Sequence, residues 1–174
     1  MQLRMIRYVR SSLDTTSTML LCNSLVLCRL DYCNTLLIGL STSDFGQMQR
    51  VFNLAARIIS RCSSFSLITP VLKSLGWLRV EDRVKLRMLR YVYISGTLWH
   101  SVLPDKLPYY SRLRRDIRSS GRLRLEVRTG RTRIGDGAFC CVAPRLWNNL
   151  PYNIRCGPSF SVISGFFLDN LLAV

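Results

Sequence analysis

The chain has 174 residues, of which 48% are apolar and 20% are charged. This composition fits one globular domain or two very small ones, and it excludes a wholly disordered chain. Lys and Arg total 25 against 10 Asp and Glu, a formal charge of +15, and 22 of the 25 are Arg, so we expect an anionic partner.

The first half of the chain is predicted to form helices. A helix is expected over Met1–Leu13, and a second over 18–37 with Thr16 or Ser17 as its N-cap and Gly39 as its end. After a polar turn over 41–46, residues 47–62 show the three- and four-residue spacing of a third helix. Thr69 and Pro70 predict the start of a short helix over 71–75, followed by Trp77 and Leu78 in the core.

The clearest amphipathic helix is expected over 80–94, with Val80, Val84, Met88 and Tyr91 on its apolar stripe. Its other side carries basic residues, which either form a solvated face or contact phosphate: Arg79, Arg83, Lys85, Arg87 and Arg90. A loop is expected near Pro104 and Pro108. Two further helices are predicted, one over 138–149 that kinks or restarts at Pro144 and one over 160–172 capped by Ser159.

Between these elements lies the basic segment, residues 111–133, with nine arginines against Asp116 and Glu126. Alternation of Leu and Arg over 122–127 favours a half-exposed strand or hairpin whose arginines line one face. Aromatic side chains at Trp99, Tyr109 and Tyr110 either stack on unpaired bases or pack in the core. The candidate nucleic-acid-binding residues are Arg112, Arg114, Arg115, Arg118, Arg122, Arg124, Arg128, Arg131 and Arg133.

Residues that would carry catalysis or hold a metal are scarce. His100 is the single histidine, and the seven cysteines include no C-x-x-C pair, so no zinc site, other metal or cofactor is expected. Gly130 and Gly135 have the spacing of a phosphate loop, but Asp136 and Gly137 follow where Lys and Ser or Thr are needed. We therefore predict that the chain is not an enzyme.

The cysteine pattern and the absence of a leader predict a reduced intracellular chain, nuclear or cytoplasmic. The Arg-rich, acid-poor start over 1–13 gives mitochondrial targeting as a minor alternative. Residues 19–40 are strongly apolar but interrupted by Arg29, Asp31 and Asn34, so no membrane insertion is expected.

Four strings occur in an informative order: LDYCNTLLIGL at 30–40, MQRVFNLAARII at 48–59, ITPVLKSLGWL at 68–78 and GDGAFCCVAPRLWNNLP at 135–151. Together they resemble the C-terminal part of reverse transcriptases from non-LTR retrotransposons, the jockey-like and chicken-repeat-like long interspersed elements. The likeness spans nearly the whole chain. GWLRV at 76–80 and Gly137 depart from the family pattern, and an apolar tail replaces its basic one.

This resemblance implies the thumb and C-terminal extension that follow the polymerase palm, which grip template RNA and target DNA. The catalytic aspartates of the family lie upstream of this region, so the resemblance carries no catalytic residue onto this chain. It also implies an upstream polymerase domain as a partner, and the departures suggest a decayed element copy.

Taken together, the sequence predicts a mainly α, bundle-like fold with a short strand or hairpin in the basic segment. Residues 1–110 would form a thumb-like region and residues 111–174 the basic segment with the C-terminal helices, packed as one domain. The expected function is sequence-nonspecific binding of RNA or DNA by a non-catalytic reverse-transcriptase fragment. The alternatives are a helical support for an absent polymerase domain, or an inert product.

Overall fold

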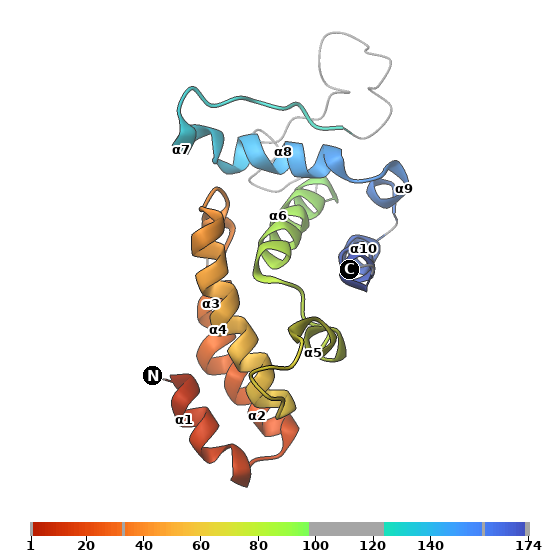
Figure 1. Ribbon diagram of the computed structural model, residues 1–174. Coiled ribbons are helices and arrows are strands. Elements are labelled where there is room, and N and C mark those ends of the chain that lie inside the picture. Colours follow the sequence, from red (N-terminus) through yellow and green to blue (C-terminus); the bar gives the residue numbers. More distant parts are fainter. Residues whose placement is uncertain (1, 33, 98–123, 158, 173–174) are drawn as a thin grey trace. The chain divides into compact units, whose positions relative to one another are not determined.

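The computed structural model describes residues 2–32, 34–97, 124–157 and 159–172, and these residues are mainly helical (Figure 1). The predicted fold class is confirmed. The chain divides into two compact units: Met1–Val84 with Leu171–Val174, and Lys85–Asn170. The division expected near residue 110 falls among residues 98–123, outside the described ranges.

The predicted N-terminal helix is α1, Gln2–Val9, which continues into the 3-10 turn η1, Arg10–Ser12. The next helix, α2, spans Thr15–Cys22. Its N-cap is Asp14, whose carboxylate accepts hydrogen bonds from the backbone N–H of Thr16 at 3.0 Å and of Ser17 at 3.3 Å. The prediction of Thr16 or Ser17 as the cap was wrong, because an ionised side chain two residues earlier takes both N–H groups.

A single helix over 18–37 was also expected, and the structure divides this stretch. After α2 come a π-helical turn η2, Asn23–Leu27, the short α3, Cys28–Asp31, and the 3-10 turn η3, Asn34–Leu37. At the start of the π-helical turn, the Ser24 hydroxyl donates to the Leu20 carbonyl at 2.9 Å. Hydroxyl groups that bond back to the preceding turn disturb the regular helical ladder, which the spacing of apolar residues does not reveal.

Helix α4 spans Thr42–Ser60 and includes the residues expected to form a polar turn. Ser41 is its N-cap: the hydroxyl accepts from the Asp44 N–H at 3.2 Å and donates to the Asp44 carboxylate at 2.7 Å. This reciprocal pair resembles a capping box and starts the helix before Gly46. The helix ends at Arg61, whose backbone is left-handed with φ of 52°.

Helix α5 spans Ile68–Ser74 and begins earlier than predicted, with Thr69 inside it rather than at the cap. Gly76 follows with φ of +64°, a backbone conformation that residues other than glycine rarely adopt. Trp77 and Leu78 are buried, as predicted.

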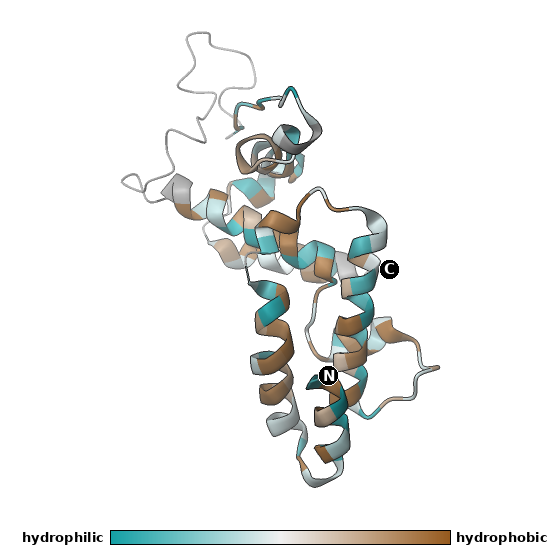
Figure 2. Cartoon of the chain, turned by 90° about the vertical axis from the view of Figure 1, so that its left-hand side faces the viewer, coloured by the Kyte–Doolittle hydropathy of each residue, from teal (hydrophilic) through white to brown (hydrophobic). Residues whose placement is uncertain are grey.

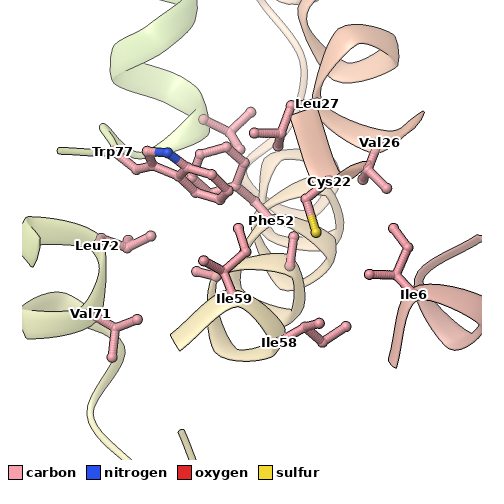
Figure 3. Packing of buried hydrophobic residues seen from close by; sticks show 13 residues of the cluster. Ile6, Cys22, Val26, Leu27, Phe52, Ile58, Ile59, Val71, Leu72 and Trp77 are labelled. Atoms are coloured by element: carbon pink, nitrogen blue, oxygen red, sulfur yellow. The ribbon is translucent and has the colours of Figure 1, made fainter. Parts of the chain in front are cut away.

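The core of the first unit is an apolar cluster to which α1, α2, α4 and α5 all contribute (Figure 3). At its centre the Phe52 and Trp77 rings lie 4.8 Å apart, and Ile59 and Leu72 are almost fully buried. Full burial of such a side chain stabilises the fold by about 1.5–3 kcal/mol. In Figure 2 the helices carry both apolar and polar residues, in keeping with one buried and one solvated face.

Helix α6, Val80–Thr97, begins in the first unit and continues in the second. The Val80 N–H donates to Gln49 Oε1 at 2.8 Å, and the Arg83 guanidinium forms a two-point ion pair with Asp31. The predicted stripe is correct for Val80, Val84 and Met88, which are buried. Tyr91, however, is 41% exposed, and Val92 is buried instead.

The second unit also contains α7, Arg133–Asp136, α8, Phe139–Asn149, α9, Tyr152–Arg155, and α10, Phe160–Leu172. Helix α8 runs without a break through the buried Pro144, so the helix does not restart there. Within this unit, the Phe160 ring of α10 lies 5.9 Å from the Tyr93 ring of α6.

Candidate nucleic-acid interface

The described part of the basic segment is an extended stretch that leads into α7. Residues 124–130 contain an isolated bridge at Leu125 and no strand. The extended backbone is as predicted, but the described residues do not form the expected strand or hairpin. Five of the nine candidate arginines lie outside the described residues: Arg112, Arg114, Arg115, Arg118 and Arg122.

The first anchor of this stretch is Asn148 on α8. The Leu125 N–H donates to Asn148 Oδ1 at 2.9 Å, and Asn148 Nδ2 donates to the Leu125 carbonyl at 2.8 Å. One side-chain amide thus occupies both hydrogen-bonding groups of a residue that is 1% exposed. The pairing satisfies both backbone groups of this buried residue, which would otherwise cost free energy.

The second anchor is Asp136, at the end of α7. Its carboxylate accepts from the Gly130 N–H at 3.2 Å and from the Arg145 guanidinium of α8 at 2.8 and 2.5 Å. A Cβ added to Gly130 would lie 2.3 Å from the Asp136 nitrogen, so only glycine allows this approach. Residues 125–136 are therefore fixed to α8 at both ends.

The charges of the second anchor stabilise each other. Hydrogen bonds from Arg145, and secondly from the Gly130 N–H, lower the pKa of Asp136 from its ordinary value of 3.8 to about 2. The same carboxylate raises the pKa of Arg145. Both groups are thus charged at neutral pH, and Arg145 is committed to holding the segment in place.

Between the two anchors, arginines face solvent. Arg128 and Arg131 are exposed, and among the residues that the structure describes neither is hydrogen-bonded or ion-paired. Arg124 is half-buried, and its Nε finds no acceptor within the described ranges. Arg133 starts α7, and its side chain lies outside the described part of the structure. The geometry thus presents two free guanidinium groups on an anchored backbone, where they can contact phosphate.

In contrast to Arg128 and Arg131, two basic residues of α6 contact other side chains of the protein. Arg83 pairs with Asp31, and the Arg90 guanidinium lies 5.9 Å from the centre of the Phe160 ring. Arg79, just before the helix, is exposed. Arg83 and Arg90 thus contact other side chains of the protein. For the other basic residues of this face, the two interpretations, a solvated face or phosphate contact, stay predictions.

Comparison with protein-family models, curated proteins and solved structures finds no significant match to this chain. What the basic segment can bind is therefore inferred from its own geometry and chemistry. The sequence analysis did not predict that three residues hold this segment in place: Asn148, Asp136 and Arg145. Their partners lie 6 to 23 residues away, and side-chain bonds over such spans leave no periodic pattern.

The remaining candidates from the sequence are the aromatic residues, the histidine, the cysteines and a membrane-spanning helix. Trp99, His100, Tyr109 and Tyr110 lie outside the described residues. Among the residues described, no three His, Cys, Asp or Glu side chains gather as metal ligands would. Two of the thiols, Cys22 and Cys141, are buried, and burial raises the pKa of both. Nor does any helix of the described part combine the length and apolarity that crossing a membrane requires.

Proposed function

We propose that this chain binds RNA or DNA without sequence preference, as a non-catalytic fragment related to the C-terminal part of a non-LTR retrotransposon reverse transcriptase. The observation that carries the proposal is the pair of solvent-facing guanidinium groups, Arg128 and Arg131, on a backbone anchored to α8 at both ends. The four sequence strings that resemble this family support the assignment.

An anchored backbone matters because binding otherwise costs the entropy of ordering a flexible segment. Arginine suits this task since its planar fork gives two parallel hydrogen bonds to phosphate oxygens. Neither Leu125, which is buried, nor Val127, which is 37% exposed, offers donors to read bases. Phosphate contact without base contact gives affinity that depends on salt and not on sequence.

The test is a salt titration of single-stranded RNA binding to the full chain, followed by fluorescence anisotropy. Each phosphate contact on a single strand contributes about −0.7 to the slope of log affinity against log salt. We therefore expect the double variant R128Q/R131Q to bind more weakly and to lose about 1.4 from the slope. Oligonucleotides of different sequence should bind with similar affinity.

The matched control is R50Q/R79Q, which removes the same charge from two exposed arginines outside the basic segment. This control should keep the slope of the unmodified chain. Equal loss of slope in the two double variants would show that net charge alone attracts RNA. Binding that is undetectable or insensitive to salt would contradict the proposed function.

A second candidate function, helical support for a polymerase domain, is favoured by a different observation. Several large apolar side chains of the first unit are at least 80% exposed: Tyr8, Tyr32, Leu36, Phe65 and Leu67. Large apolar side chains that gather into one exposed patch mark places where another protein surface packs. If support is the function, the isolated chain should self-associate in sedimentation experiments, and R128Q/R131Q should leave RNA association unchanged.

A further inference from the structure

A second group of arginines lies in the first unit, apart in sequence from the basic segment. A hollow of about 230 Å³ is lined by Arg7 of α1, Arg10 of η1, Arg57 of α4 and Arg61, together with Leu54, Ile58, Cys62 and Ser64. None of these eight residues is acidic. Four positive charges from two distant stretches of sequence therefore share one hollow.

Two of these arginines are explained by the fold. Arg10 donates to the carbonyls of Ile58 and Ile59, both at 2.9 Å, in the last turns of α4. Arg61 in turn donates to the carbonyls of Arg10 and Leu13, both at 3.3 Å. Helices α1 and α4 end at the same side of this unit (Figure 1), and each guanidinium caps the other helix's end.

Capping does not neutralise the charge of the hollow. Arg10 is 7% exposed, and its side chain contacts carbonyl and hydroxyl oxygens but no carboxylate. The carboxyl end of a helix contributes about half a negative charge, so two ends leave about three positive charges uncompensated. Asp14, the nearest acid along the chain, directs its carboxylate to the N–H groups of Thr16 and Ser17. A buried cation without a counterion is costly, which favours an anion from solution.

Donors for such an anion remain in the hollow. Arg57 gives one hydrogen bond, from Nη2 to the Ser66 carbonyl at 3.2 Å, and its Nη1 makes no hydrogen bond among the described residues. Arg7 is exposed and makes no hydrogen bond or ion pair within the described part of the chain. Both side chains line the hollow, so their free N–H groups can converge on one ligand.

We propose that this hollow, the arginine pocket, binds a phosphate group that carries two negative charges. A terminal phosphate or free phosphate has a charge of about −1.5 to −2 at pH 7 and several acceptor oxygens, whereas a phosphate within a nucleic-acid backbone carries −1. The dianion better matches about three uncompensated charges, and its oxygens match the forked donors of arginine. This proposal does not depend on RNA binding by the basic segment.

The experiment is calorimetric titration of inorganic phosphate into the full chain at fixed ionic strength, with chloride as the reference anion. The unmodified chain should bind phosphate, and R7Q should bind it about tenfold more weakly, because it loses charge-assisted hydrogen bonds. R50Q is the matched control: Arg50 is an exposed arginine of α4 outside the lining. It should bind phosphate as the unmodified chain does.

A second variant, R57Q, should weaken phosphate binding in the same way, and its melting temperature shows whether it remains folded. R7Q keeps the test decisive if R57Q unfolds, because Arg7 is exposed and makes no hydrogen bond or ion pair within the described part of the chain. Phosphate binding no stronger than chloride binding would overturn the proposal. So would equal loss of affinity in R7Q and R50Q.

The source of the phosphate is distinguished by two RNA oligonucleotides that differ only in a 5′-phosphate. If the phosphorylated RNA binds more tightly to the unmodified chain but not to R7Q, the pocket takes a nucleic-acid end. If inorganic phosphate binds but the 5′-phosphate adds nothing, the ligand is free phosphate. In the variant R128Q/R131Q the binding of inorganic phosphate should be unchanged, so failure of the proposed function and failure of this proposal are separable.

Discussion

At the scale of single residues, Asn148 holds the start of residues 125–136, the anchored stretch, by binding the backbone N–H and C=O of Leu125. Asn148→Ala leaves a buried N–H and a buried carbonyl without partners, which costs about 1–3 kcal/mol for an unsatisfied group. We expect a loss of about 2 kcal/mol in the free energy of unfolding, measured by urea denaturation.

The neighbouring Asn149 provides a matched control, since it has the same side chain and is exposed at the end of α8. Asn149→Ala should change the free energy of unfolding by less than about 0.5 kcal/mol. If both substitutions have the same effect, the amide of Asn148 does not anchor the segment.

Asp136 makes a pH-dependent contribution at the other end of the stretch. Its pKa is about 2 in the folded chain and 3.8 ordinarily, so the ion pair with Arg145 stabilises the fold fully only at pH values well above 3.8. This contribution is lost as the pH falls through 3.8 towards 2. Asp136→Asn should therefore be less stable than the unmodified chain at pH 7, and the difference should shrink as the pH falls to about 2.

The comparison between the two chains is needed because Asp14 also titrates at low pH: its hydrogen bond with Ser17 lowers its pKa. Thermal unfolding from pH 2 to pH 7 measures both chains, and the Asp14 contribution cancels in the difference. A difference in stability that does not vary with pH would show that the carboxylate charge of Asp136 is not what matters.

At the scale of elements, helix centres could be predicted from apolar spacing, but several helix starts could not. Apolar residues at three- and four-residue intervals correctly placed the middle of α4 and α6. The start of α2 was misplaced because Asp14, which precedes the two predicted caps Thr16 and Ser17, accepts hydrogen bonds from the backbone N–H groups of both. Ser41 likewise extends α4 across residues whose polarity suggested a turn.

The cap of α2 gives a testable difference. Asp14→Ala removes the acceptor of two backbone N–H groups and should lower the free energy of unfolding. Thr16→Ala, the control, should have little effect because the exposed Thr16 takes part through its backbone and not through its hydroxyl. Chemical denaturation that shows the larger loss for Thr16→Ala would restore the original prediction.

The conformation of the anchored stretch could be predicted from the sequence only in part. Alternation over 122–127 put Leu125 and Val127 on one face; Leu125 is buried as that pattern requires, but Val127 is 37% exposed. Asn148, on helix α8, binds both backbone groups of Leu125. A side-chain amide that binds the backbone in this way has no signature in the alternation of apolar and charged residues.

At the scale of the whole molecule, the net charge of +15 could be read from composition, but its arrangement could not. Some arginines are used internally: Arg83 and Arg145 pair with carboxylates, and Arg10 caps α4. Others remain available, Arg128 and Arg131 on the anchored stretch and Arg7 in the arginine pocket. The pocket joins residues about 50 positions apart, so only the folded chain shows it.

The most direct test of RNA binding by the basic segment is footprinting of all 22 arginines of the full chain. Arginines are modified with a guanidinium-specific reagent with and without single-stranded RNA, and the modified sites are identified by mass spectrometry. We predict that RNA protects Arg128 and Arg131, while Arg50 and Arg79 stay equally reactive. Protection spread evenly over all exposed arginines, or absent from the basic segment, would contradict the account.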